Sequence, residues 1–144
     1  MLVARRHRYD KVSVCGYLVD VYCLGVKNAL GPEITDEAGL RGFINRFFSG
    51  FEAEPLIAPI ELACEVVFGS MEYASRLGFD PHPDFPAAQG HLGSWTGPSI
   101  ITFGRNGKPM YVSGPYDNAL SVIRTLERTV GPGNFDFVGT AVDL

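Results

Sequence analysis

The sequence predicts a single α+β domain whose mixed or mainly antiparallel sheet is built from two hairpins and a C-terminal strand, packed by a long central helix and two further helices. Three observations predict this fold class. The run from Val12 to Cys23 is apolar at both strand parities. Apolar residues recur every three or four positions between Pro55 and Gly78, which is the spacing of a helix face. The Asn106-Gly107 pair stands between two apolar segments and is the strongest short hairpin signal.

The first part of the chain predicts a hairpin. Residues Leu2 to Arg8 are expected to form a short strand, which turns at residues 9–11 and pairs with a second strand from Val12 to Cys23. Because both parities of the second strand are apolar, it is expected to be central and covered on both faces. Gly16 within it suggests a bulge or the close approach of another backbone. Residues Leu24 to Pro32 are expected to be a connector.

Two helices are expected next. Thr35 precedes acidic residues as an N-cap would, and the helix that follows is expected to end near Gly50. The long central helix is expected to begin near Pro59, since proline is tolerated only in a first turn, and to end in a left-handed conformation at Gly78. The expected buried positions of the first helix are Leu40, Phe43, Ile44, Phe47 and Phe51, and those of the second are Ile60, Ala63, Val67, Met71, Ala74 and Leu77.

After the central helix, residues Asp80 to Asp84 are expected to form a rigid polar turn, because prolines flank His82, and a second short helix follows. Residues 99–103 and 110–113 are expected to pair as strands around the Asn106-Gly107 turn. Asp117 is a plausible cap for a third helix that carries Leu120, Ile123, Leu126 and Val130, and residues 135–138 predict a last strand.

Size and cysteine content point to a soluble protein of the cytoplasm. With 144 residues and 46% hydrophobic content, the chain can bury one good core. The longest mostly apolar run, Leu56 to Met71, is shorter than a bilayer crossing needs, and no stretch behind Arg5 and Arg6 is long enough for a signal peptide. Three cysteines in apolar surroundings, Cys15, Cys23 and Cys64, predict buried free thiols in a reducing compartment.

The charges are unevenly distributed along the chain, although the net charge is only −4. Residues 1–27 carry a net +3, residues 28–104 carry −7 and the remainder is neutral. The net charge therefore does not favour nucleic acid as a partner. The basic segment from Arg5 to Lys11 leaves a local contact with a phosphate backbone open, and its alternative interpretation is an edge strand that charges protect from sheet-to-sheet aggregation.

Three stretches carry a resemblance to a known family: LVDVYCLGVKN at residues 18–28, YASRLGFDPHPDF at residues 73–85 and GKPMYVSGPYD at residues 107–117. Together they resemble an uncharacterised family of small bacterial and archaeal proteins, some of which sit beside SEC-C or helix-turn-helix segments. The resemblance covers most of the chain and implies no activity, since none is established for that family. The chain shows neither the SEC-C cysteines nor a second domain.

No assembled catalytic motif is present in the sequence, which lacks a phosphate loop, a CxxC pair, HExxH and a nucleophile elbow. Asp20 is the most informative single residue, because an ionised carboxylate in a buried strand costs several kcal/mol unless it is paired or hydrogen-bonded. It either anchors structure, through backbone N–H groups or one of Lys27, Arg105 and Lys108, or it belongs to a functional site. We also predict that Asp20 and His82 lie within reach of one pocket.

Two further groups of polar residues are candidates. His82, Asp84 and His91 could bind a divalent metal if the short helix returns His91 towards His82, although their spacing matches no standard zinc pattern and the alternative is a hydrogen-bonded turn. The residues Tyr111, Ser113, Tyr116 and Asp117 gather at a strand-to-helix junction. This junction is either a capped helix start or a site for an anion at backbone N–H groups.

These observations leave two functional hypotheses. The first is a binding or regulatory module that acts through a protein partner or through self-association, and the absence of a catalytic motif favours it. The second is a metal-dependent hydrolase acting on phosphodiesters, with Asp20, His82 and Asp84 as catalytic residues and Glu65 as a further candidate.

Overall fold

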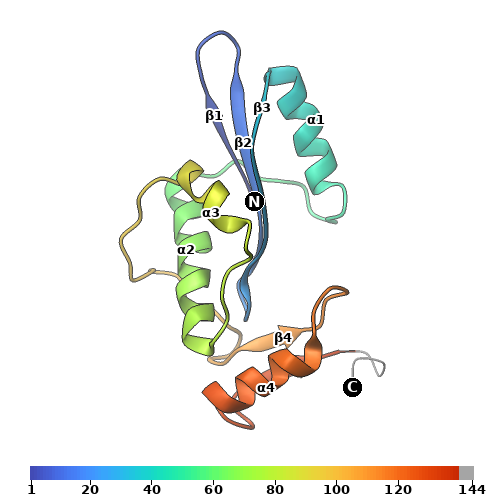
Figure 1. Cartoon of the computed structure of the whole chain (residues 1–144), viewed down its shortest axis with the longest axis vertical. Helices are drawn as coiled ribbons and strands as arrows, with labels where there is room; N and C mark the ends of the chain where they lie inside the picture. Colours follow the sequence, from blue (N-terminus) through green and yellow to red (C-terminus); the bar gives the residue numbers. More distant parts are fainter. Residues whose placement is uncertain (140–144) are drawn as a thin grey trace.

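An antiparallel three-stranded sheet forms the N-terminal part of the molecule. The computed structural model describes residues 1–139. Strands β1 (Leu2–Arg6), β2 (Val12–Asp20) and β3 (Gly25–Thr35) lie in the order β1-β2-β3, so β2 is central as predicted. Figure 1 shows α1 on one side of this sheet and α2 with α3 on the other. The α+β fold class is therefore confirmed.

Residues 12–17 of β2 are buried on both faces, which confirms the interpretation of its doubly apolar pattern. The pairing of β2 with β3 shifts register between Val14 and Gly16 and again between Leu18 and Val19. A Cβ at Gly16 would lie 2.8 Å from the Phe47 ring, so the strand approaches its neighbours too closely there for a side chain.

The expectation that residues Leu24 to Pro32 form a connector is wrong, because almost all of them belong to β3. The signals that argue against a strand are real: Gly25 and Gly31 have positive φ, and Pro32 offers no N–H to a ladder. The hairpin forms because β3 places Val26 and Ala29 in the core next to β2, and this tertiary packing outweighs the weak local propensity.

Helix α1 (Glu37–Phe48) covers one face of the sheet with Leu40, which is buried with Val12 and Val14. Its N-cap is Asp36 rather than the predicted Thr35, and the Asp36 carboxylate accepts a hydrogen bond from the Gly39 N–H at 2.7 Å. Phe51 was expected on the buried stripe but follows the helix and is 52% exposed. The stripe therefore ends with the helix.

Helix α2 (Ile60–Leu77) covers the opposite face and agrees with the prediction at both ends. Pro59 is the N-cap and Gly78 is a left-handed C-cap with φ of 95°. Ala63, Val67, Ala74 and Leu77 are buried, while Ile60 and Met71 are partly buried. Beyond the proline-rich turn lie α3 (Phe85–Ala88) and the short 3₁₀ helix η1 (Gln89–His91), and Phe85 is buried in the same core as Val67.

The Asn106-Gly107 turn is confirmed, whereas its flanking strands are not. Both residues have positive φ, 54° and 79°, as a type I′ turn needs, but the turn closes on a single bridge between Arg105 and Lys108. Residues 99–103 form no strand. Instead the Glu65 carboxylate of α2 accepts hydrogen bonds from the Ser99 hydroxyl and from the Ile100 N–H, at 2.6 and 3.1 Å.

The C-terminal part of the described chain forms a second, smaller sheet covered by a helix. Strand β4 (Met110–Val112) pairs in parallel with β5 (Asp136–Val138), so the predicted second hairpin is replaced by a crossover through α4 (Ala119–Thr129). Asn118 caps α4 in place of the predicted Asp117, and Leu120 is 48% exposed instead of buried. The helices of residues 1–139 include none with the length and apolar character that crossing a bilayer requires.

Candidate functional site

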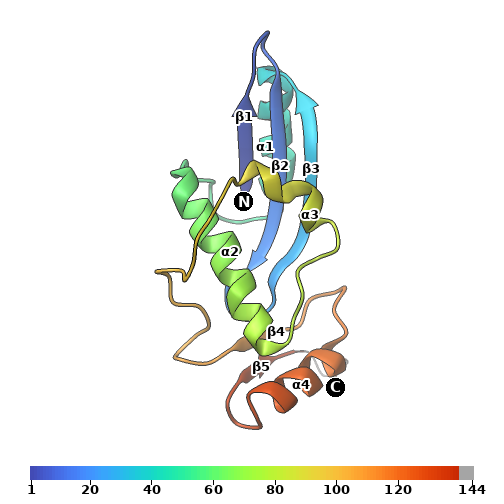
Figure 2. The same cartoon turned by 60° about the vertical axis from the view of Figure 1, so that its left-hand side comes forward.

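A hollow of about 450 Å³ lies where β3, the segment after α2 and the start of α4 meet. Its walls come from the start of β3, from residues Gly78 to Pro83 and from the first two turns of α4. Figure 2 shows the segment after α2 running beside β3, with α4 below it. The lining residues are Leu24, Val26, Lys27, Gly78, Phe79, Asp80, Pro81, His82, Pro83, Asp117, Asn118, Ser121, Val122 and Thr125.

An ion pair between Lys27 and Asp117 forms one wall of the hollow. The Lys27 Nζ lies 3.0 Å from the Asp117 Oδ2, and the two side chains are only 24% and 12% exposed. Lys27 reaches this position because it follows Val26, whose side chain is buried on the other side of the strand in the main core. The pair joins the first sheet to the loop that precedes α4.

Asp117 is ionised because several donors surround its carboxylate. Burial by itself would raise the pKa of Asp117, but the Gly114 N–H, the Lys27 ammonium and the Tyr111 hydroxyl outweigh this effect and lower it. The Gly114 N–H and the Tyr111 O–H both donate to Oδ2, each at 2.9 Å. A Cβ at Gly114 would lie 2.9 Å from the Lys27 Nζ, so a glycine at this position leaves room for the pair.

The backbone of the proline-rich turn fixes the position of His82. Its N–H donates to the Val26 carbonyl at 3.0 Å, which ties the turn to β3. Its ring Nδ1 accepts a hydrogen bond from the Asp84 N–H at 3.1 Å. Since Nδ1 is an acceptor, the neutral imidazole carries its proton on Nε2. The rigid turn predicted from the two prolines therefore presents a defined tautomer at the hollow.

The remaining lining combines an apolar floor with polar groups of α4. Leu24 and Val122 contribute aliphatic surface, and Phe79 contributes a partly buried ring. The Asn118 side chain caps α4 by accepting the Ser121 N–H at 3.1 Å. The hollow therefore joins apolar surface to one ammonium, one imidazole and carboxylates.

Asp20 has a structural role in this arrangement. Its two carboxylate oxygens accept hydrogen bonds from the Tyr22 N–H at 2.9 Å and from the Leu24 N–H at 3.0 Å. These bonds close the turn between β2 and β3. Of the alternatives named for Asp20, the structure therefore shows the one in which backbone N–H groups hold the carboxylate. The sequence predicted that Asp20 and His82 lie within reach of one pocket. Among the residues that the structure describes, His82 lines the hollow and Asp20 does not.

The predicted metal ligands are not brought together. His82 and Asp84 are neighbours, 3.8 Å apart at their closest ring and carboxylate atoms, but the His91 Nε2 lies 2.9 Å from the Ser13 hydroxyl instead. The His7 Nε2 contacts the same hydroxyl at 2.6 Å. Within residues 1–139 no group of three or more metal-ligating side chains is assembled.

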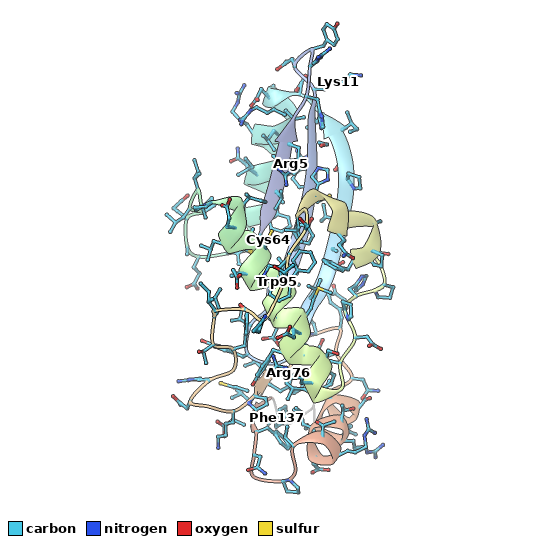
Figure 3. All side chains as sticks on the ribbon, turned by 90° about the vertical axis from the view of Figure 1, so that its left-hand side faces the viewer. Arg5, Lys11, Cys64, Arg76, Trp95 and Phe137 are labelled. Carbon is cyan, nitrogen blue, oxygen red and sulfur yellow. The ribbon has the colours of Figure 1, made fainter. Side chains whose placement is uncertain are left out.

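Of the other candidate residues, Tyr111 hydrogen-bonds to Asp117 at the wall of the hollow, whereas Tyr116, Ser113 and Glu65 lie elsewhere. Tyr111 is buried and its hydroxyl reaches Asp117, whereas Tyr116 is fully exposed. Ser113 continues the parallel sheet, since its N–H donates to the Val138 carbonyl at 3.0 Å. Glu65 holds the loop over α2, accepting the Trp95 Nε1–H at 3.1 Å, and Figure 3 shows Trp95 lying against this helix.

The basic N-terminal segment begins at the end of the edge strand β1, with Arg5 and Arg6, and continues through the turn that leads to β2. Figure 3 shows Arg5 and Lys11 along the hairpin that projects from the body of the molecule. The Arg5 guanidinium donates to the His91 carbonyl at 2.7 Å, and Arg6 pairs with Glu37. β1 is therefore an edge strand with charges along it, the arrangement that the aggregation-protection alternative describes.

The role of Lys27 was not predicted from the sequence, where this residue was considered only as a partner for Asp20. The signal was an ammonium directly between the apolar Val26 and the Asn28-Ala29 pair of one strand, where partial burial requires an anionic partner. Each of the three stretches that carry the family resemblance contributes to the hollow, through Lys27, His82 and Asp117. No family model, curated protein or solved structure matched the chain.

Proposed function

We propose that this chain is a binding module and that a small polar molecule occupies the hollow beside Lys27, His82 and Asp117. The observation that carries the proposal is the convergence of three distant segments on one hollow. A volume of about 450 Å³ lies within the roughly 300–1,000 Å³ of small-molecule sites. The lining also has the mixture of apolar surface and a few polar groups that such sites use.

The Lys27–Asp117 pair supports this assignment. Removing two charges from water costs several kcal/mol per ion, and apolar side chains of similar volume often stabilise a fold as well or better. A partly buried pair at the wall of a hollow is more informative than one in a closed core, because a ligand can use the hydrogen-bonding capacity that the pair leaves unused. The three buried free cysteines also suit a reducing compartment such as the cytoplasm.

A thermal-shift screen of small polar metabolites tests the proposal. A ligand present at ten times its Kd stabilises the native state by about 1.4 kcal/mol, which raises the Tm of a domain of this size by a few degrees. Ser121→Trp would fill the hollow from the exposed surface of α4. Ser75→Trp on the exposed face of α2, which does not line the hollow, is the matched control.

We expect the active compounds to stabilise the wild type and Ser75→Trp but not Ser121→Trp. The proposal is wrong if no compound raises the Tm, or if Ser121→Trp responds as the wild type does. A response only to a protein or to a second copy of the chain would place the binding surface outside the hollow. No observation favours the metal-dependent hydrolase as a second function.

A further inference from the structure

We propose that the ligand of the hollow is a free amino acid with an apolar side chain, held by its carboxylate on one side and by its ammonium on the other. This inference rests on the proposed function and names its ligand class. It follows from three features of the lining: unused donors, unused acceptors and an apolar floor.

The donors are on Lys27 and His82. The Lys27 ammonium has three N–H bonds, and its hydrogen bonds to residues 1–139 use one of them, on Asp117. The His82 ring has Nε2 as its donor, because Nδ1 accepts from the Asp84 N–H. The His82 backbone is bonded to Val26, the residue before Lys27, so the two donors lie on neighbouring walls. Such a pair suits the two oxygens of a carboxylate.

The acceptors are on Asp117 and Asp80. Lys27, Tyr111 and Gly114 all donate to the Asp117 Oδ2, and no hydrogen bond from within residues 1–139 reaches Oδ1. Asp80 also lines the hollow, and it is exposed. Two carboxylates that retain accepting capacity suit an ammonium group, which donates three hydrogen bonds.

Charge balance decides between ligand classes. The lining carries one ammonium from Lys27 against two carboxylates from Asp80 and Asp117, so these three groups sum to −1. This balance disfavours a purely anionic ligand such as inorganic phosphate, while Lys27 disfavours a simple cation. A zwitterion meets both signs. Between the charged groups the floor offers Leu24, Phe79 and Val122 to an apolar side chain.

Isothermal titration with L-leucine and L-phenylalanine tests this inference. Two analogues of leucine each lack one charged group: 3-methylbutylamine has no carboxylate and 4-methylpentanoate has no amine. We expect at least one of the two amino acids to bind. The analogues of that amino acid that lack the carboxylate or the amine should bind at least tenfold more weakly. Equal binding of an analogue, or no binding of either amino acid, would overturn the inference.

Two variants identify the groups involved. Lys27→Met should weaken amino-acid binding at least tenfold, and Lys108→Met is its matched control because Lys108 pairs with Asp136 at 3.2 Å outside the hollow. If Lys27→Met does not fold, as judged by circular dichroism, Asp80→Asn replaces an exposed carboxylate and should weaken binding about threefold. Unchanged affinity in the folded variant would contradict the inference.

The outcomes separate this inference from the proposed function. If polar metabolites stabilise the protein in a manner that Ser121→Trp abolishes, but neither amino acid binds, the ligand class is wrong and the proposed function stands. If no compound binds, or if Ser121→Trp does not weaken the binding of any compound, both the proposed function and the amino-acid inference are wrong.

Discussion

The Lys27 ammonium and the Asp117 carboxylate lie 3.0 Å apart although 90 residues separate them in the sequence. Lys27 is on β3 of the first sheet, and Asp117 precedes α4, which covers the second. This pair, with Tyr111 behind it, fixes the wall of the hollow. The stability of the fold and the shape of the candidate site therefore depend on the same contact.

Lys27→Met is expected to lower the free energy of unfolding by about 1–3 kcal/mol, because it leaves a partly buried carboxylate without its cationic partner. Lys108→Met removes a pair whose side chains are 39% and 46% exposed, and should cost less than about 1 kcal/mol. Urea denaturation of both variants measures the difference. Equal losses would show that the Lys27–Asp117 pair behaves as a surface pair.

The pH dependence of stability should report Asp117. Burial opposes ionisation of this carboxyl, but its donors lower the pKa below that of the unfolded chain. A lowered pKa means that the unfolded state binds more protons on acidification, so the stabilisation is complete above the unfolded pKa of about 3.9 and is lost as pH falls through the folded pKa. The stability difference between wild type and Asp117→Asn should narrow from pH 7 to pH 3. A difference independent of pH in this range would contradict this assignment.

Gly107→Val should destabilise the protein by about 1–2 kcal/mol or more, because a β-branched residue is strained at φ of 79°. The added side chain meets no neighbour within 4 Å, so the cost would come from the backbone. Gly50→Val is the control, since Gly50 is equally open and lacks a positive φ. A Tm for Gly107→Val equal to that of the control would show that the turn tolerates side chains.

The three cysteines should react slowly with a thiol reagent in the native protein. Cys15, Cys23 and Cys64 are buried and free. Burial, followed by the nearby Asp20 and Asp117 charges, raises the pKa of Cys23 to about 12, so almost no thiolate is present near pH 8. All three should become reactive after unfolding. Rapid native labelling of Cys23 would show that the contact between the two sheets opens readily.

Local rules predicted the parts of the fold that depend on neighbouring residues. The periodicity and caps of α2, the doubly apolar β2 and the two positive φ angles at Asn106-Gly107 are all properties of short segments. Strand β3 was missed because Gly25, Gly31 and Pro32 weaken its local signal while packing against β2 stabilises it. The parallel pairing of β4 with β5 was missed because it joins segments that a helix separates.

The candidate site shows the same division. His82, Tyr111 and Asp117 could be named from the sequence, because a proline-flanked histidine and polar residues before a helix are unusual locally. Which of these residues lie next to one another could not be predicted from the sequence. His91 turns to Ser13 instead of His82, and the sequence gives no measure of such a long-range choice. Lys27 and Asp117 likewise meet only once both sheets are in place.

Chemical-shift mapping by ¹H–¹⁵N NMR tests the central claim that the hollow is the ligand site. The wild-type protein would be titrated with the compounds that raise its Tm most. We expect the largest amide chemical-shift changes at Leu24 to Lys27, at Gly78 to His82 and at Asp117 to Thr125, with saturation at one common Kd. Shifts concentrated instead on β1 and α1, or none that saturate, would contradict it.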